Sequence, residues 1–155
     1  KFDAASAELD AYIRSLNQQY AGADIHCSLD FRCPLGSYKY ITTQYGQGGH
    51  KGVDLAAPQG TPIYAAADGV VTVAAYHYSY GNYVSIYHGS ADDGNTYATL
   101  YAHMSQAPSV STNQQVKKGD LIGYVGNTGY SFGNHLHLEL RVNGNRTNPL
   151  SYIPH

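Results

Sequence analysis

The sequence predicts an all-β protein, an antiparallel β-sheet sandwich or groove fold with an N-terminal helix. From residue 38 onward, short runs rich in aromatic and β-branched residues alternate with turn residues. The 155 residues include 16 Tyr and 17 Gly, a composition typical of short strands and many turns. No segment after Gly22 has helix-length periodicity. Because parallel strands need long crossovers, the short connections favour antiparallel pairing in a sandwich or a partly closed barrel.

The first 22 residues carry a helical pattern. Their apolar side chains recur at intervals of three and four, at Phe2, Ala5, Leu9, Tyr12, Leu16 and Tyr20. Gly22 is a suitable stop. The helix either packs on its own domain or ends a longer helical hairpin or coiled coil that begins upstream. We favour the second reading because the first five positions also fit a heptad seam. We therefore expect an N-terminal helix over residues 1–24 and a main domain over residues 25–155.

The main domain begins with an irregular loop over residues 25–37. Strands are expected over residues 38–43, 62–66, 70–76, 83–88, 96–103, 121–125 and 136–142. Asp68-Gly69 lies between two apolar runs and predicts a tight turn. The polar loop 89–95 joins its flanking strands as a hairpin, and Asn143-Gly144-Asn145 turns the chain again.

The charge composition argues against two classes of protein. Charged residues make up 13% of the chain, the net charge is −2, and no basic run exceeds Lys117-Lys118, so a nucleic-acid partner is not expected. No apolar run approaches the ~20 residues that span a bilayer. A chain of this length can fold without a metal, so any metal is expected to serve function. The start at Lys1, without a secretory signal, indicates a processed or shortened chain.

Cys27 and Cys33 lie six residues apart in the loop that follows the helix. They are unrelated thiols, or they form a local disulfide if the protein is exported to an oxidising compartment. A second zinc site that includes His26 is a third reading, although it needs a fourth ligand. The sequence leaves these readings open.

Two short motifs supply metal ligands. His50 and Asp54 are four residues apart, and the glycines around them favour a turn that runs into a strand over a helix. Asp54 has apolar neighbours, where a carboxylate without a cation or partner is costly. In His135-Leu136-His137 the two imidazoles share one strand face, with Cβ atoms about 6–7 Å apart. That separation suits one imidazole on a metal and the other beside a metal-activated water.

Three further observations concern the remaining titratable residues. His103 ends a predicted strand, but the residues alone do not distinguish it from His88 as a candidate. Glu139 shares the strand face of His137 and points inward, so we expect a partner of that histidine or a structural role. The other imidazoles are expected at the surface or between strands: His26, His77, His88 and His155.

Ordered sequence blocks between residues 41 and 149 carry a family resemblance. The blocks are 44–46 (QYG), 50–58 (HKGVDLAAP), 60–71 (GTPIYAAADGVV), 101–104 (YAHM), 116–123 (VKKGDLIG), 126–129 (GNTG) and 135–139 (HLHLE). In their order and content the chain resembles the lysostaphin/LytM-type zinc endopeptidases, the beta-lytic metallopeptidases that cut bacterial peptidoglycan. The resemblance implies an antiparallel β-sheet groove walled by loops, and it makes residues 25–155 a zinc metallopeptidase catalytic domain.

The resemblance also implies a role for each matching residue. His50, Asp54 and His137 would bind Zn²⁺, and His103 and His135 would be the catalytic imidazoles. Three protein ligands would leave the zinc an open position for water. One of the two catalytic histidines would act as general base, and the other would help hold the oxyanion.

Tyr45 completes the candidate site. In the mechanism we expect, its hydroxyl is a donor near the oxyanion, and a strand-end aromatic packed for stability is an equal alternative. The substrate implied is a peptide of peptidoglycan, in a stem or a crosslink, and the implied location is extracytoplasmic: secreted, in the cell wall or in the periplasm. An upstream coiled coil or inhibitory segment is a further expectation.

Two rival functions remain. A non-catalytic module that activates cell-wall amidases would suit the N-terminal helix, although all five metal and imidazole positions are intact. A carrier domain of the biotinyl or lipoyl type would explain residues 116–123, which resemble the hairpin of such barrels. The sequence lacks the modifiable Lys at a tight turn that a carrier domain needs.

Overall fold

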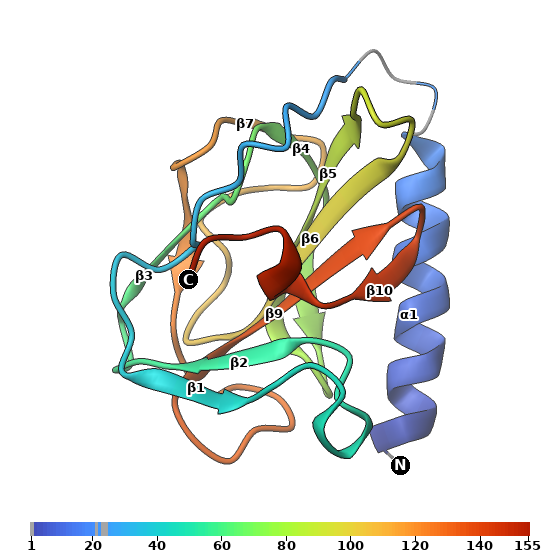
Figure 1. Ribbon diagram of the computed structural model, residues 1–155. Helices are drawn as coiled ribbons and strands as arrows, with labels where there is room; N and C mark the ends of the chain where they lie inside the picture. Colours follow the sequence, from blue (N-terminus) through green and yellow to red (C-terminus); the bar gives the residue numbers. More distant parts are fainter. Residues whose placement is uncertain (1, 21, 23–24) are drawn as a thin grey trace.

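The computed structural model describes residues 2–20, 22 and 25–155 (Figure 1). Its helix is α1 (Phe2–Gln19), and its strands are β1 (Tyr40–Thr43), β2 (Val53–Ala56), β3 (Pro62–Tyr64), β4 (Gly69–His77), β5 (Gly81–Ser90), β6 (Thr96–Met104), β7 (Gln115–Val116), β8 (Leu121–Tyr124), β9 (His135–Val142) and β10 (Asn145–Thr147). Two 3₁₀ turns, η1 (Gln47–Gly49) and η2 (Pro149–Ser151), complete the described elements. No helix in these ranges combines the length and the apolarity that crossing a bilayer requires.

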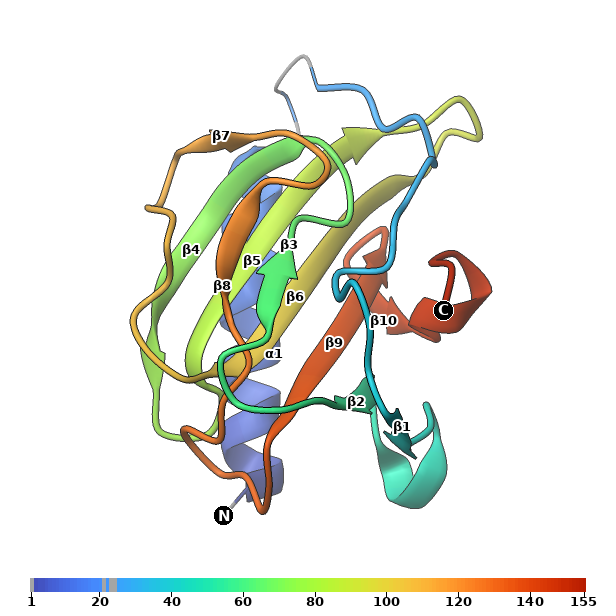
Figure 2. The same cartoon turned by 90° about the vertical axis from the view of Figure 1, so that its left-hand side faces the viewer.

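The strands form a large sheet and a small one, all paired antiparallel. The order in the large sheet is β1-β2-β9-β6-β5-β4-β7, and β10 pairs with the end of β9. The small sheet contains β3 and β8. In Figure 2 the small sheet lies in front of the large one and α1 lies behind it. The predicted all-β, antiparallel fold with an N-terminal helix is therefore confirmed.

The main core lies between the two sheets. Successive side chains of a strand point to opposite faces, so Leu136, Leu138 and Leu140 of β9 all enter this core. They pack with Ile63 of β3 and Ile122 of β8, and each of these five side chains is at most 1% exposed. The alternate residues of β9 face the other way, and this second face carries the polar side chains of the site.

Helix α1 covers much of that second face. Leu9 and Ile13 pack against Val73 and Leu100 of the sheet, and Leu16 is partly buried beside them. The predicted apolar stripe is thus only partly right. Tyr12 is 50% exposed, and Ile13 takes the buried position instead. The helix packs on its own domain, while a coiled coil upstream stays a prediction. The side chains at positions 2 and 5 lie outside the described part.

Two strands and one turn differ from the sequence-based expectation. β7 and β10 were not predicted, since two or three residues are too few for a periodic signal. The turn at Asp68 does not close a hairpin, because β3 pairs with β8 whereas β4 pairs with β5 and β7. Asp68 is held instead by the backbone N–H of Lys118, which donates to its Oδ1 at 2.7 Å. The turn therefore links the two sheets.

The two cysteines are free thiols in this structure, Cys27 buried and Cys33 half-buried. Both pack in the main core, and burial raises the pKa of the Cys27 thiol. Within the described ranges they do not join His26 in a group of metal-ligating atoms. His26 instead lies near Asp92, with Nε2 3.8 Å from Oδ1.

His88 is a fully buried interstrand imidazole, with 0% exposure. Its Nδ1–H donates to the carbonyl oxygen of Asp68 at 2.7 Å, and its Nε2 accepts from the hydroxyl of Thr99 at 2.7 Å. This pattern fits a neutral ring. Burial lowers the pKa of His88 to about 4.

Truncating Ile13 should show how much the docking of α1 contributes. Ile13 is 0% exposed, so Ile13→Ala is expected to lower the free energy of unfolding by about 2–4 kcal/mol through lost burial and a cavity. Tyr12→Ala, at the neighbouring half-exposed position, should cost under about 1 kcal/mol. Urea unfolding measures both values, and equal losses would contradict this packing.

The stability of the protein should depend on pH through His88. The unfolded chain protonates this ring below its ordinary pKa of 6.5, whereas the folded chain resists protonation down to about pH 4. Stability should therefore fall as the pH drops from 6.5 to 4, by roughly 3 kcal/mol from this group. In His88→Gln the unfolding free energy should depend less steeply on pH, and the difference in slope should correspond to the uptake of at most one proton on unfolding. An unchanged slope would show that His88 does not titrate in this way.

Candidate metal centre and catalytic groove

The pairing of β2 with β9 brings the two sequence motifs together. Asp54 lies directly opposite His137 in the antiparallel ladder. His50 precedes β2 at the end of the glycine-rich η1 turn, which returns its ring towards the same place. Gly52 is required between them, because a Cβ at that position would come within 2.8 Å of His137 Cε1 and 2.5 Å of the Leu138 carbonyl oxygen. The predicted turn running into a strand is therefore present.

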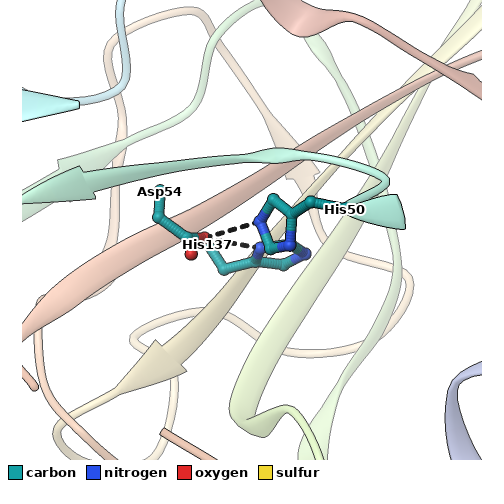
Figure 3. A group of neighbouring side chains, drawn as sticks. All are labelled: His50, Asp54 and His137. Atoms are coloured by element: carbon teal, nitrogen blue, oxygen red, sulfur yellow. Dashed lines mark hydrogen bonds and ion pairs between the residues drawn. The ribbon is translucent and has the colours of Figure 1, made fainter. Parts of the chain in front are cut away.

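Three side chains converge on one point. His50 Nε2 lies 3.1 Å from Asp54 Oδ1, and His137 Nδ1 lies 2.8 Å from the same oxygen (Figure 3). The ligand atoms of all three residues lie within 4.8 Å of one another. Two imidazole nitrogens and one carboxylate oxygen form a donor set that suits Zn²⁺. The residues thus fit the metal that the sequence predicts.

The electrostatics of this cluster favour a cation. Burial alone would raise the pKa of Asp54, but hydrogen bonds from His137 and His50 outweigh it and hold that pKa well below its usual range. Burial alone would lower the pKa of His137, but its contacts with Asp54 and Glu139 raise that pKa to about 9. Asp54 is therefore held as a carboxylate that can bind a cation, and a metal at Nδ1 of His137 would replace the proton there.

The second nitrogen of His137 is also held. Its Nε2 lies 2.9 Å from Glu139 Oε2, and the Tyr80 hydroxyl donates to the same oxygen. Glu139 is 2% exposed, and although burial opposes ionisation, His137 and two arginines lower its pKa to about 2. A carboxylate that accepts from the far nitrogen of a ligating imidazole fixes its tautomer and orientation. The contacts agree with the partner role expected for Glu139.

His103 adjoins the cluster from the end of β6. Its φ of 64° is left-handed, which breaks the strand alternation and lets its ring line the site. Its Nδ1–H donates to the carbonyl oxygen of Thr128 at 2.7 Å, so Nε2 is left as the nitrogen that accepts protons. Burial, together with the nearby ring of His137, lowers the pKa of His103 to about 4.

His135 lies beside His103, with ring centroids 4.9 Å apart. Its Nδ1–H donates to the carbonyl oxygen of Gly133 at 2.7 Å, and its Nε2 lies 3.7 Å from Asp54 Oδ1. Both rings therefore have Nδ1 anchored on a loop carbonyl, and the Nε2 of His135 faces the metal cluster. His135 is not among the three grouped ligands. The two histidines of the His-x-His motif thus have different positions, as the strand spacing suggests.

The cluster lies in a groove of about 550 Å³. One wall comes from β1 and the other from the loop before β9, and exposed aromatic rings stand on both. The lining residues are Tyr40, Thr42, Thr43, His50, Asp54, Ala56, Tyr80, His103, Tyr130, Ser131, Phe132, Gly133, Asn134, His135 and His137. An open groove of this kind admits an extended peptide.

Tyr45 and Tyr80 differ in their position relative to the groove. Tyr45 does not line the groove, and its hydroxyl donates to the carbonyl oxygen of Arg146 at 3.2 Å. This contact agrees with the packing alternative, and the position of the hydroxyl near an oxyanion stays a prediction. Tyr80, which sequence reasoning missed, lines the groove and bonds Glu139. No local signal separates it from the other 15 of the 16 tyrosines.

Much of the chain is similar in sequence to known proteins. The model of Peptidase family M23 matches residues 48–149. DD-carboxypeptidase/endopeptidase Mpg of Neisseria meningitidis serogroup B is 49% identical over 102 residues, which cover 66% of this chain and 22% of that relative. Murein hydrolase activator NlpD of Escherichia coli is 41% identical over 125 residues, which cover 80% of this chain and 31% of that relative. The chain thus spans less than a third of either relative.

Solved structures share the fold. A zinc-containing peptidase of Vibrio cholerae superposes with a TM-score of 0.67 at 33% identity, covering 77% of this chain and 39% of that one. Lysostaphin of Staphylococcus simulans superposes with a TM-score of 0.65 at 30% identity, covering 81% of this chain and 54% of that one. The resemblance inferred from the sequence blocks is confirmed, and the chain belongs to peptidase family M23.

Proposed function

We propose that this chain is a zinc-dependent endopeptidase that hydrolyses peptide bonds in bacterial peptidoglycan. One observation carries the proposal: His50, Asp54 and His137 meet at the floor of an open groove beside two further imidazoles. Three protein ligands with room for a fourth are typical of catalytic rather than structural zinc.

The relatives support the substrate class. Mpg is named as a carboxypeptidase and endopeptidase, and ShyC of Vibrio cholerae, 49% identical over 100 residues, is named as a peptidoglycan DD-endopeptidase. A substrate in peptidoglycan places the proposed action outside the cytoplasm. The groove walls, which comprise β1 and the loop before β9, decide whether the bond lies in a stem peptide or a crosslink.

The metal and the histidines divide the chemistry. When bound by His50, Asp54 and His137, zinc supplies Lewis-acid chemistry that lowers the pKa of water and polarises a carbonyl. His103 is neutral at pH 7, so its Nε2 can accept a proton from a water molecule in the groove as general base. The carbonyl of Thr128 holds this ring in the tautomer that the step needs.

The remaining steps use the rings of His103 and His135. Attack on the peptide carbonyl turns its oxygen into an oxyanion, to which His135 can donate when Nε2 carries a proton. His103 then returns its proton to the leaving amine nitrogen as the C–N bond breaks. Glu139 and the Gly133 carbonyl keep His137 and His135 in place throughout.

A second function is favoured by one relative. NlpD is named as a murein hydrolase activator, and its match covers more of this chain than the match to Mpg. In an activator the groove would bind a partner and perform no hydrolysis. The presence of all five metal and imidazole residues speaks for the enzyme, because an activator has no need of them.

Hydrolysis should require the metal. Purified protein with zinc is expected to release new amino groups and peptide fragments from isolated peptidoglycan, to stop after chelation and to recover on addition of zinc. Asp54→Asn and His137→Ala should lose both bound zinc and turnover, whereas Asp92→Asn, whose side chain is 97% exposed, should keep both. Retained turnover in His137→Ala would refute the ligand set. If the protein alone releases no fragments but speeds up cleavage by an added amidase, the activator function is established instead.

The two catalytic histidines should be separable from the ligands. His103→Ala and His135→Ala are each expected to keep zinc yet lower kcat by roughly 10²–10⁴-fold, since each removes a proton carrier or an oxyanion donor. His26→Ala removes an imidazole whose side chain is 60% exposed and serves as the control. Zinc content by atomic absorption and kcat on a defined muropeptide give the result. Near-wild-type turnover in either variant would remove that residue from the mechanism.

A further inference from the structure

A row of polar side chains runs along one face of β9. His135, His137, Glu139 and Arg141 alternate with the leucines of the main core, so they share the face that α1 covers. The row begins in the groove and ends beneath the helix. It therefore gives a physical path between an element outside the groove and the metal cluster.

Each step along this row is a direct contact. Glu139 Oε2 lies 2.9 Å from His137 Nε2, and Arg141 Nη2 donates to Glu139 Oε1 at 3.4 Å. Arg141 Nη1 donates to Asp10 Oδ1 of α1. Arg146 also reaches both acids, with Nε 3.4 Å from Asp10 Oδ1 and Nη1 3.8 Å from Glu139 Oε2.

The central pair of this row is deeply buried. The side chains of Arg141 and Glu139 are each 2% exposed, and that of Asp10 is 16% exposed. Arg141 Nε has no hydrogen-bond partner in the described chain. The two carboxylates and the Gly144 carbonyl accept from the other nitrogens and offset the cost of burying this guanidinium. If Asp10 is neutralised, Arg141 keeps Glu139 as its carboxylate partner.

We propose that Asp10 is a positioning residue for the metal centre and that α1 is thereby part of the active-site architecture. The inference rests on the proposed metal site. By holding Arg141, Asp10 keeps this guanidinium from pairing fully with Glu139, and Glu139 stays available to accept from His137. The helix thus sets the strength of a hydrogen bond that orients a metal ligand.

The expected direction follows from charge. Neutralising Asp10 leaves Arg141 with Glu139 as its one carboxylate partner among the described residues, so Glu139 pairs more closely with Arg141 and becomes a weaker acceptor for His137. The change also removes one negative charge from a buried network near a cation. Both effects lower zinc affinity. A direct partner of a ligand is worth about 10–100-fold in affinity, so we expect roughly 3–10-fold for Asp10, one contact further away.

The experiment measures zinc affinity, not turnover. The full chain is freed of metal, and its zinc dissociation constant is measured by competition with a chromogenic chelator for wild type, Asp10→Asn, Asp10→Glu and Glu8→Gln. Glu8 is an exposed acid on the same helix, so Glu8→Gln is the matched loss of charge. Asp10→Asn should bind zinc 3–10-fold more weakly, while Glu8→Gln and the charge-conserving Asp10→Glu should stay near wild type. The visible spectrum of bound Co²⁺ should change in Asp10→Asn alone.

A double-mutant cycle tests the route. If Asp10 acts through Glu139, the effect of Asp10→Asn on zinc affinity should vanish in a Glu139→Gln background. Arg141→Lys, which keeps the charge but lacks the planar fork that spans two carboxylates, should weaken zinc binding as well and serves if Asp10→Asn does not fold.

The outcomes are distinct. If Asp10→Asn matches Glu8→Gln in zinc affinity, or if its loss adds fully to that of Glu139→Gln, the positioning role is wrong. If the wild type itself fails to bind zinc, the proposed function fails first. Zinc binding without peptidoglycan cleavage would leave the positioning role standing and overturn the enzymatic proposal.

Discussion

The antiparallel pairing of β2 with β9 is the constraint on which the site depends. It places Asp54 opposite His137, two residues 83 positions apart in the chain, with 2.8 Å between oxygen and nitrogen. A shift of one residue in this register would turn His137 into the leucine core and Leu136 into the groove. The apolar face of β9 therefore holds the ligand in place, because burying its leucines in the main core excludes the shifted register.

The same alternation explains why charged groups are tolerated in this interior. Both faces of the large sheet are covered, one by the small sheet and one by α1. Polar residues on the helix-covered face must then find partners within the protein, and they do so in a continuous row from Asp10 to His137. Buried charge, the helix and the ligand are thus parts of one arrangement, which the proposed positioning role extends to function.

Much of the site was open to sequence reasoning, and part of it was not. The ligand candidates stood out because carboxylate and imidazole recur in a chain with few charges, and the blocks around them resemble one family. The anchors did not stand out. The Thr128 and Gly133 contacts to His103 and His135 use backbone carbonyls, which every residue has. Their role depends on where loops lie, and composition does not report that.

Local pattern alone determined the longer strands, the hairpin over residues 89–95, the helical N-terminus and the residue types able to bind zinc, since periodicity and donor chemistry are properties of neighbouring residues. Tertiary structure decided that the turn at Asp68 joins two sheets, that Ile13 rather than Tyr12 is buried, and that Tyr80 rather than Tyr45 reaches the site network. These outcomes depend on which distant segments pack together. Packing is a relation between surfaces far apart in the chain, and a local pattern carries little information about it.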